Sequence, residues 1–446
     1  RKEKLMRVVY VGDNRNRGNF GCRGTSTALS QLISQQNTIV GRISGKYTNW
    51  DTGEVYVVNG KNEKFYVRKS KNKYWKYEKK FLYYWHKLCD GKGKFLMGKH
   101  DFASLDFEKA IQNLINCLPA NPDLKELDLR QYDFDALVVN GEGSFIFSTP
   151  SWIWREAIVE SVLMYWALKM GKKVYYLNGM LSDDPNSKHN DDTIKYVKNI
   201  FNSCQAVCVR EYKSVEYAKK YFPNIKLKVF PDALFTWYDL VNDNHVVNNG
   251  RYYIPHSAEC DENYSILDFS RPYICVSGSS AIIKACNGNI EIAIMRYCNL
   301  IQKIKERVDF QVFLVIVDDG DEFLNEVAKM TNTPIIPMDM PLVAAAKILA
   351  NSRVYISGRY HPAIMASLGG TPCVFMSSNS HKTESIQELL EYDTVEEFNL
   401  LPDDNECTKI VEAAIRKMND PKLRKKIKQR SEYLSIQASG LARVIE

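Results

Sequence analysis

The sequence predicts an α/β protein with two domains, each built on an open parallel sheet, that face each other across a central cleft. Short apolar runs alternate with helical segments along the chain, a pattern typical of parallel strands joined by crossover helices. The alternation stops near residue 242 and starts again near residue 273. The length of 446 residues exceeds one ordinary core and suits two domains.

The first half of the chain repeats a strand–loop–helix unit. A strand over 6–11 leads into a glycine-rich loop and then a helix that Thr25 or Ser26 is expected to cap. Three further buried strands are predicted, at 136–140, 173–177 and 205–209. We assign residues 1–245 to an N-terminal Rossmann-like domain.

The same rhythm returns after a polar linker and predicts a C-terminal Rossmann-like domain over 246–430. Its strands are expected at 273–276, 311–317, 334–336, 353–356 and 373–376. The basic end of the chain is helical in pattern and is expected to cross between the domains. Residues 431–446 would then pack back on the N-terminal domain.

Composition favours a globular, cytoplasmic protein. Hydrophobic residues make up 45% and charged residues 25% of the chain. No apolar run approaches the roughly 20 residues of a membrane span, and no apolar signal segment precedes the first strand. The eleven cysteines are scattered singly, without paired metal-ligand spacing, so we expect reduced thiols and no metal site.

A basic segment rich in aromatic residues lies between Lys61 and Lys99. Thirteen Lys or Arg residues stand there against only Glu63, Glu78 and Asp90. Such a segment can contact an anionic glycan, nucleic acid or the anionic lipid at the inner face of a membrane. A solvated helical hairpin whose aromatic rings pack into the domain is an equal alternative. Its aromatic order matches no base-stacking module, so no nucleic-acid partner is expected.

The segment Ser357-Gly-Arg-Tyr-His361 is the strongest candidate site, because ligands in parallel α/β folds bind beyond the carboxyl ends of strands. Pro362 suits the first turn of the helix that follows, and a helix N-terminus favours an anion. Arg359 adds a planar fork for carboxylate or phosphate, and His361 can carry a proton near neutral pH. The alternative is a histidine that merely caps a packed helix.

Three further strand ends carry polar groups. Lys382 opens the helix after strand 373–376, and Arg210 ends strand 205–209 on the opposite wall. Asp232 follows another strand and could pair with Arg210 or act as a base. The loop from Gly12 to Gly24 lacks both the Walker lysine and the dinucleotide spacing, which excludes ATPase and dehydrogenase functions there. Three cations and one histidine predict a small, highly anionic substrate.

These motifs, in this order, resemble the polysaccharide pyruvyl transferase family. The resemblance covers roughly residues 6–240 and 270–392 and lies in Asn19-Phe-Gly21, Gly141-Glu-Gly143, Val209-Arg-Glu211, Pro231-Asp-Ala233, Ser357-Gly-Arg-x-His361, Gly370-Thr-Pro372 and Asn379-x-His-Lys382. It implies a GT-B-like pair of domains, with the donor on the C-terminal domain. Cys22-Arg23 stands where the family commonly has an aspartate, so contacts with the acceptor could differ.

The resemblance also implies the reaction. Phosphoenolpyruvate would donate a pyruvyl group to a sugar of a cell-surface polysaccharide or its lipid-linked precursor, forming a ketal without a further cofactor. The donor would be held by Arg210, Arg359, Lys382, Ser357 and Gly358. His361 would act as acid or base with Asp232. The acceptor side would comprise Asn19, Gly21, Gly141, Glu142 and Gly143. The segment 61–99 could grip the acceptor's lipid carrier or cover the cleft.

Two other functions stay open at this point. A nucleotide-sugar glycosyltransferase of the same architecture could use the same cations to hold a diphosphate. Glu384 and Glu388 lie only about one helical turn apart, too close for a paired ribose-binding motif. A non-catalytic glycan-binding protein would be expected to lack the three cations, all of which are present.

Overall fold

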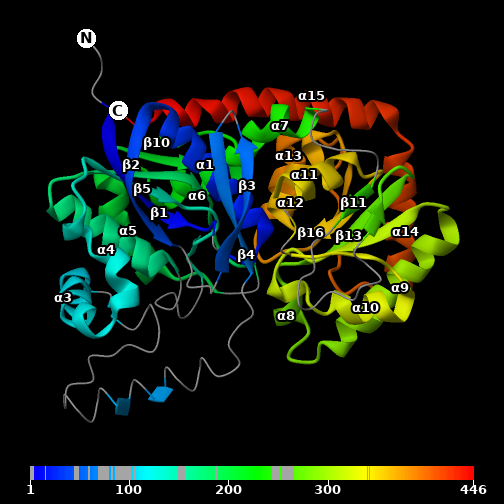
Figure 1. Cartoon of the computed structure of the whole chain (residues 1–446), viewed down its shortest axis with the longest axis horizontal. Coiled ribbons are helices and arrows are strands. Elements are labelled where there is room, and N and C mark those ends of the chain that lie inside the picture. Colours follow the sequence, from blue (N-terminus) through cyan, green and yellow to red (C-terminus); the bar gives the residue numbers. More distant parts are fainter. Residues whose placement is uncertain are drawn as a thin grey trace.

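The predicted fold class is confirmed. The computed structural model describes residues 5–44, 50–58, 61–68, 80–81, 84–85, 102–148, 156–243, 251–253 and 266–445, except 16, 105, 186, 187, 339 and 341. Its two large sheets have six strands each, and their strands pair in parallel. Figure 1 shows them side by side, with helices on both faces of each sheet.

The first sheet has the order β10-β9-β7-β5-β1-β2. Its strands are β1 (Met6–Asp13), β2 (Asn37–Ser44), β5 (Ala136–Asn140), β7 (Lys173–Gly179), β9 (Ala206–Val209) and β10 (Leu227–Val229). Its helices are α1 (Phe20–Gln36), α3 (Phe107–Cys117), α4 (Glu156–Lys169), α5 (Asp191–Ser203), α6 (Tyr212–Tyr221) and α7 (Tyr238–Asn242). The central strands are buried on both faces, which explains their continuous apolar sequences.

The predicted cap of α1 is wrong. Thr25 and Ser26 lie inside the helix and are fully buried. Asn19 caps the helix instead, because its side-chain Oδ1 accepts a hydrogen bond of 3.0 Å from the Cys22 N–H. The glycine-rich loop is therefore shorter than expected, and its last turns belong to the helix.

The second sheet has the order β15-β14-β13-β16-β17-β18. Its strands are β13 (Tyr273–Ser279), β14 (Gln311–Val315), β15 (Ile335–Ile336), β16 (Tyr355–Gly358), β17 (Cys373–Met376) and β18 (Glu397–Phe398). Its helices are α8 (Ile282–Ala285), α9 (Glu291–Arg307), α10 (Leu324–Thr331), α11 (Leu342–Asn351), α12 (Tyr360–Leu368), α13 (Lys382–Leu389) and α14 (Asp404–Met418).

Three short sheets lie outside this framework. Strands β3 (Trp50–Val58) and β4 (Lys61–Arg68) form an antiparallel hairpin, so a helical hairpin is wrong for the first part of the basic segment. Most of 69–99, on which the expected membrane or glycan contact depends, lies outside the described residues. The other pairs are β6 (Phe145–Ile146) with β8 (Leu181–Ser182), and β11 (Arg251–Tyr253) with β12 (Ile266–Asp268).

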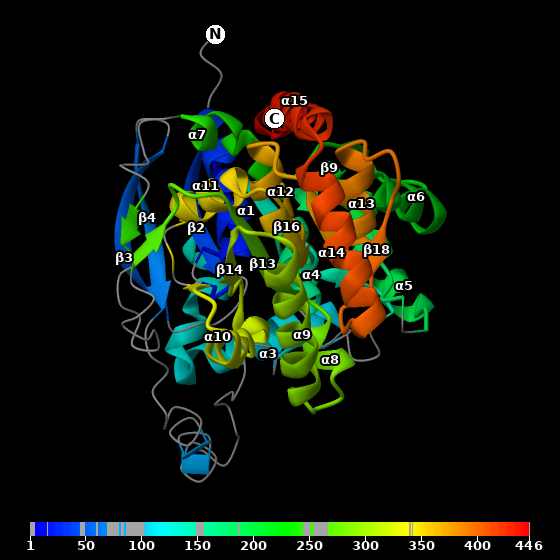
Figure 2. The same ribbon diagram turned by 90° about the vertical axis from the view of Figure 1, so that its right-hand side faces the viewer.

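The two domains share a hydrophobic core. Helix α1 and the short helix η5 (Ala233–Trp237) of the first domain pack against α12 of the second. Helix α15 (Pro421–Ala438) runs along both domains in Figure 1 and is seen nearly end-on in Figure 2. The η9 turn (Ser439–Arg443) that follows it returns to α1. In the described part of the chain, no helix is both long and apolar enough to cross a membrane.

Candidate active site

A cavity of about 220 Å³ lies where the carboxyl ends of the two sheets meet. Both domains line it, as the strand-end rule predicts. The first domain contributes Asn14, Arg17, Asn19, Cys22, Asn140, Gly141, Glu142, Gly143, Ser144, Glu160 and Arg210, and the second Ser280, Asp318, Arg359, Tyr360, His361, Asn379 and Lys382. The cations and the histidine singled out in the sequence therefore face one space.

His361 stands on the first turn of α12 and contacts two charged groups of the other domain. Its Nε2 lies 3.3 Å from Asp232 Oδ2 and 3.1 Å from Arg210 Nη1. Arg210 Nη1 also donates to Asp232 Oδ2 at 2.9 Å, so the predicted Arg210–Asp232 pair is present. Burial alone would raise the pKa of Asp232, but His361, Arg210 and Thr25 outweigh burial and lower it. Asp232 is fully buried behind His361, so it holds the imidazole and does not line the cavity.

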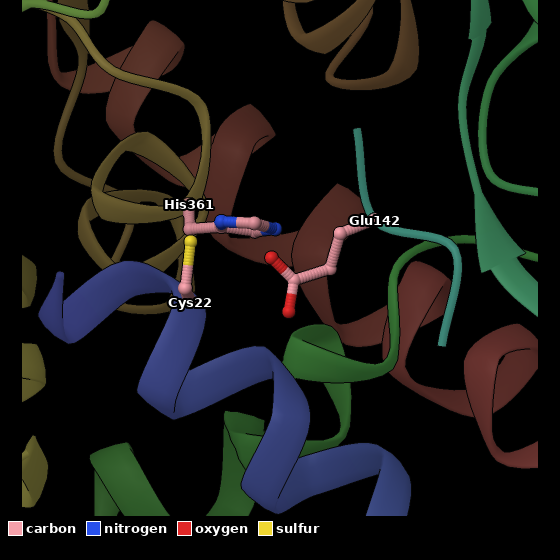
Figure 3. A group of neighbouring side chains, drawn as sticks. All are labelled: Cys22, Glu142 and His361. Carbon is pink, nitrogen blue, oxygen red and sulfur yellow. The ribbon is translucent and has the colours of Figure 1, made fainter. Parts of the chain in front are cut away.

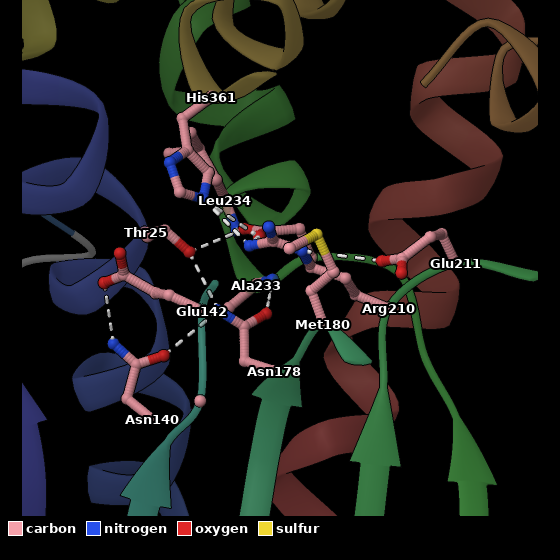
Figure 4. Close-up of polar contacts among 12 residues, drawn as sticks. Thr25, Asn140, Glu142, Asn178, Met180, Arg210, Glu211, Ala233, Leu234 and His361 are labelled. Carbon is pink, nitrogen blue, oxygen red and sulfur yellow. Dashed lines mark hydrogen bonds and ion pairs between the residues drawn. The ribbon is translucent and has the colours of Figure 1, made fainter. Parts of the chain in front are cut away.

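A chain of hydrogen-bonded polar side chains leads to Asp232, the residue that contacts both His361 and Arg210 (Figure 4). The Ala233 N–H donates to Asn178 Oδ1 at 2.9 Å, which fixes the orientation of that amide. Asn178 Nδ2 therefore points at Thr25 Oγ1, 2.9 Å away, and at Asn140 Oδ1, 3.3 Å away. Thr25 in turn donates to Asp232 Oδ1 at 2.6 Å. Asn178 has a positive φ of 57°, a strained backbone that places its amide in this chain.

Arg359 is held by two aspartates. Its guanidinium donates to both oxygens of Asp318, at 2.7 and 2.8 Å, and to Asp321 Oδ1 at 2.6 Å. Asp321 is fully buried, and burial raises the pKa of its carboxyl to about 6. The Asp318 side chain is 28% exposed and lines the cavity. A donor anion would have to compete with Asp318 for Arg359, so direct contact between Arg359 and the donor stays a prediction.

Of the cations that line the cavity, Lys382 is the one most available to bind an anion. Its Nζ donates to Asn379 Oδ1 at 3.3 Å, and among the described residues no ion pair joins it to an acidic side chain. Burial, followed by the positive charge of Arg210, lowers the pKa of Lys382 to about 8. The negative charge of an arriving anion would offset both effects and favour the protonated form of Lys382.

Ser357 and Gly358 lie beneath the cavity wall and do not line it, in contrast to the prediction. Ser357 is buried, lies 2.7 Å from Ser277 through the two hydroxyls, and accepts from the Arg359 N–H at 3.0 Å. A Cβ at Gly358 would come within 2.6 Å of Ser279. Both residues are part of strand β16 and position the backbone of Arg359.

The predicted glycines bring the walls close together. A Cβ at Gly141 would come within 2.1 Å of Tyr176, and one at Gly143 within 3.2 Å of Lys382 Nζ. Gly21 faces α12, where an added Cβ would lie 2.8 Å from His361 Cβ. Asn19 caps α1 and donates to Asp318 Oδ2 at 3.0 Å, which links the two domains at the cavity.

Gly21→Ala is therefore expected to displace His361 and lower activity at least about tenfold, because a 1 Å misplacement of a catalytic group can cost more than that. Gly24→Ala is the matched control on the same helix. Its added Cβ would meet Met365 Cε at 2.7 Å, the end of a flexible side chain that can move. Steady-state rates of both variants check the prediction, and equal rates would contradict it.

Cys22, Glu142 and His361 converge in the cavity (Figure 3). Their potential ligand atoms lie within 4.8 Å of one another, and these residue types bind Zn²⁺ in other proteins. Arg210 and Lys382 line the same cavity, and their positive charge opposes a bound cation. Burial raises the pKa of the Cys22 thiol. The positive charge of the cavity therefore argues against a metal ion at this cluster.

The fold and the site together define a GT-B-like protein with a cationic cavity between its domains. The model of the family described as polysaccharide pyruvyl transferase matches residues 51–380, so the chain belongs to the polysaccharide pyruvyl transferase family. Membership supports a transferase that acts on a polysaccharide. No curated protein matches the chain significantly.

Solved structures agree on the fold. The UDP-GlcNAc 2-epimerase of Neisseria meningitidis, bound to UDP-GlcNAc, is similar with a TM-score of 0.51 and 12% identity, over 99% of this chain and 98% of the epimerase. Another UDP-N-acetylglucosamine 2-epimerase is similar with a TM-score of 0.52 and 13% identity, over 99% and 95% of the two chains. At this identity the likeness concerns the fold alone.

Proposed function

We propose that the protein transfers a pyruvyl group from phosphoenolpyruvate to a sugar of a cell-surface polysaccharide or its lipid-linked precursor and forms a ketal. The observation that carries this proposal is Lys382, a cavity lysine without an acidic partner among the described residues, beside Arg210 and His361. Family membership supports pyruvyl transfer. The donor has a carboxylate and a phosphate, which suits this cluster of cations.

The side chains match what the reaction needs. Addition of an alcohol to the donor requires a proton on the methylene carbon, and then stabilisation of positive charge at C2 while phosphate leaves. In this proposal His361 gives the proton, and Asp232, 3.3 Å from its Nε2, holds the ring. Lys382 and Arg210, which both line the cavity, would stabilise the departing phosphate.

A nucleotide-sugar glycosyltransferase is the rival function. The cavity volume of about 220 Å³ is below the roughly 300–1,000 Å³ of pockets that enclose drug-sized ligands. Phosphoenolpyruvate is much smaller than a nucleotide sugar, so the volume favours the proposed donor.

Mass spectrometry separates the two functions. The enzyme would be incubated with phosphoenolpyruvate and a panel of 4-nitrophenyl hexosides, and in parallel with UDP-hexoses. A pyruvyl increment on a hexoside supports the proposal. A hexose increment, or neither turnover nor thermal stabilisation by phosphoenolpyruvate at about 1 mM, would reject it.

Affinity for the donor is expected to fall with rising pH above about 8, where Lys382 loses its proton. Below that pH the side chain is a cation and attracts phosphate, so affinity should be highest there. Above it, affinity should drop by up to about tenfold per pH unit. Calorimetric titration with phosphoenolpyruvate from about pH 6.5 to 9.5 measures this. The Lys382→Met variant should bind weakly and lack this decline, and an identical decline in that variant would assign it to another group.

A further inference from the structure

Glu142 occupies a strained position between two glycines. It is not glycine, yet its φ is +31°, a region that L-residues rarely adopt. Its side chain is only 6% exposed and lines the cavity. Strain of this kind persists where the surrounding structure holds it, often at functional sites. The turn after β5 thus directs a carboxylate into a space otherwise rich in cations.

Hydrogen bonds orient this carboxylate. Asn14 Nδ2 and Asn140 Nδ2 donate to its Oε1, at 2.7 and 2.9 Å. The orientation of the Asn140 amide follows from the backbone, because the Ala233 N–H fixes Asn178 and Asn178 Nδ2 faces Asn140 Oδ1. Oε1 is therefore the acceptor of both bonds. The same chain of amides reaches Asp232 through Thr25, so one network orients both Glu142 and the partner of His361.

Glu142 and His361 lie close enough for one hydroxyl to contact both side chains. A carboxylate oxygen of Glu142 and a ring nitrogen of His361 lie within 4.8 Å, and Figure 3 shows the carboxylate directed toward the imidazole. Two hydrogen bonds of about 2.8 Å that meet at one oxygen at a tetrahedral angle span about 4.5 Å. The upper limit of 4.8 Å is close to this span, so one alcohol oxygen can reach both groups.

We propose that Glu142 is a second catalytic residue, the base that takes the proton of the acceptor hydroxyl; this rests on the proposed pyruvyl transfer. In the first step, an acceptor oxygen bonds to C2 of the donor and its proton passes to Glu142, while protonated His361 gives a proton to the methylene carbon. That carbon becomes the methyl group of the ketal.

The second step restores both side chains. The second hydroxyl bonds to C2 as the C2–O bond to phosphate breaks, and its proton passes to His361. The leaving phosphate takes the proton that Glu142 held. The two hydroxyl protons thus balance one proton on the methyl carbon and one on phosphate, and no oxidant or metal is needed.

The competing explanation is that Glu142 only neutralises Arg210 and Lys382, whose charges it faces in the cavity. The two roles differ in what they change. A counter-ion acts on binding of the anionic donor, whereas a base acts on kcat.

Glu142→Gln separates them, because Gln keeps an oxygen to accept from Asn14 and Asn140 but cannot take a proton at neutral pH. We expect kcat to fall at least about 100-fold. The donor KM, and the Kd of phosphoenolpyruvate without acceptor, should stay within about threefold of wild type. The acceptor is the hexoside of the panel that the wild type pyruvylates best. Glu108→Gln, an exposed residue of α3 bonded to Tyr165, is the control.

Glu142→Asp is the second variant. It keeps the charge but withdraws the carboxylate by one methylene, so a base would lose kcat and a counter-ion would not. If kcat of Glu142→Gln stays within about threefold of wild type, or if only donor binding changes, the role of Glu142 as base is wrong. A wild type that adds a hexose, or that is neither active with phosphoenolpyruvate nor stabilised by it, rejects the proposed function itself, and the two failures are thus distinct.

Discussion

His361→Ala is expected to lower kcat for pyruvyl transfer about 1,000-fold, within the range lost with a general acid or base. The imidazole is the group in the cavity held between Asp232 and Arg210, and we expect it to deliver the proton to the donor's methylene carbon. Binding of phosphoenolpyruvate should change little, because Lys382 and Arg210 remain. Phosphate release in the presence of acceptor measures the rate.

His189→Gln is the matched control for this variant. His189 lies outside the cavity, where its Nδ1 is 2.7 Å from Asp183 and its ring stacks on Tyr221. The His189→Gln variant should release phosphate at the wild-type rate. A His361→Ala enzyme that releases phosphate as fast as wild type would show that the proton comes from another group.

Arg210→Met is expected to destabilise the fold by about 3–5 kcal/mol, the usual loss when one partner of a buried ion pair is removed. Arg210 is 1% exposed, and its removal would take the arginine from the buried carboxylates of Asp232 and Glu211, which would keep their contacts with His361 and His381. Its guanidinium also lies over the Tyr360 ring, 4.3 Å from the centroid. Urea unfolding followed by circular dichroism gives the free-energy difference.

Lys213→Met is the comparison for stability. Lys213 also pairs with an acid of the other domain, Glu384, but both side chains are partly exposed. Pairs of this kind contribute only about 0–1 kcal/mol. Equal losses from the two variants would contradict the argument that burial sets the cost.

Most strands could be predicted because the sheets are buried on both faces and their strands are continuous apolar runs. Strand β2 was missed for the opposite reason. It lies at the edge of its sheet, and its residues alternate between buried and exposed positions. The cap of α1 was misplaced because several polar residues at its start suit a cap, and only the hydrogen bond of Asn19 decides among them.

The part of the site that the sequence predicted follows from one rule, namely that ligands in parallel α/β folds bind at the ends of strands. That rule selected Arg210, His361 and Lys382, which line one cavity. It also selected Ser357, which stays in β16 and bonds within the sheet. Asp318 follows predicted strand 311–317 and could have been found by the same rule. The ion pair between Asp318 and Arg359 could not be predicted from the sequence, because the two residues meet only when β14 and β16 both lie beside β13.

The shared core between α1, η5 and α12 bears on how substrates enter. Two domains that meet through a hydrated interface can move apart at a small cost in free energy. Here a hinge opening along this seam would expose buried apolar side chains such as Leu234 and Met365 to water, at about 25 cal/mol for each Å² uncovered. We therefore expect substrate and product to exchange through movement of side chains at the cavity, such as the partly exposed Asp318, and not through separation of the two domains.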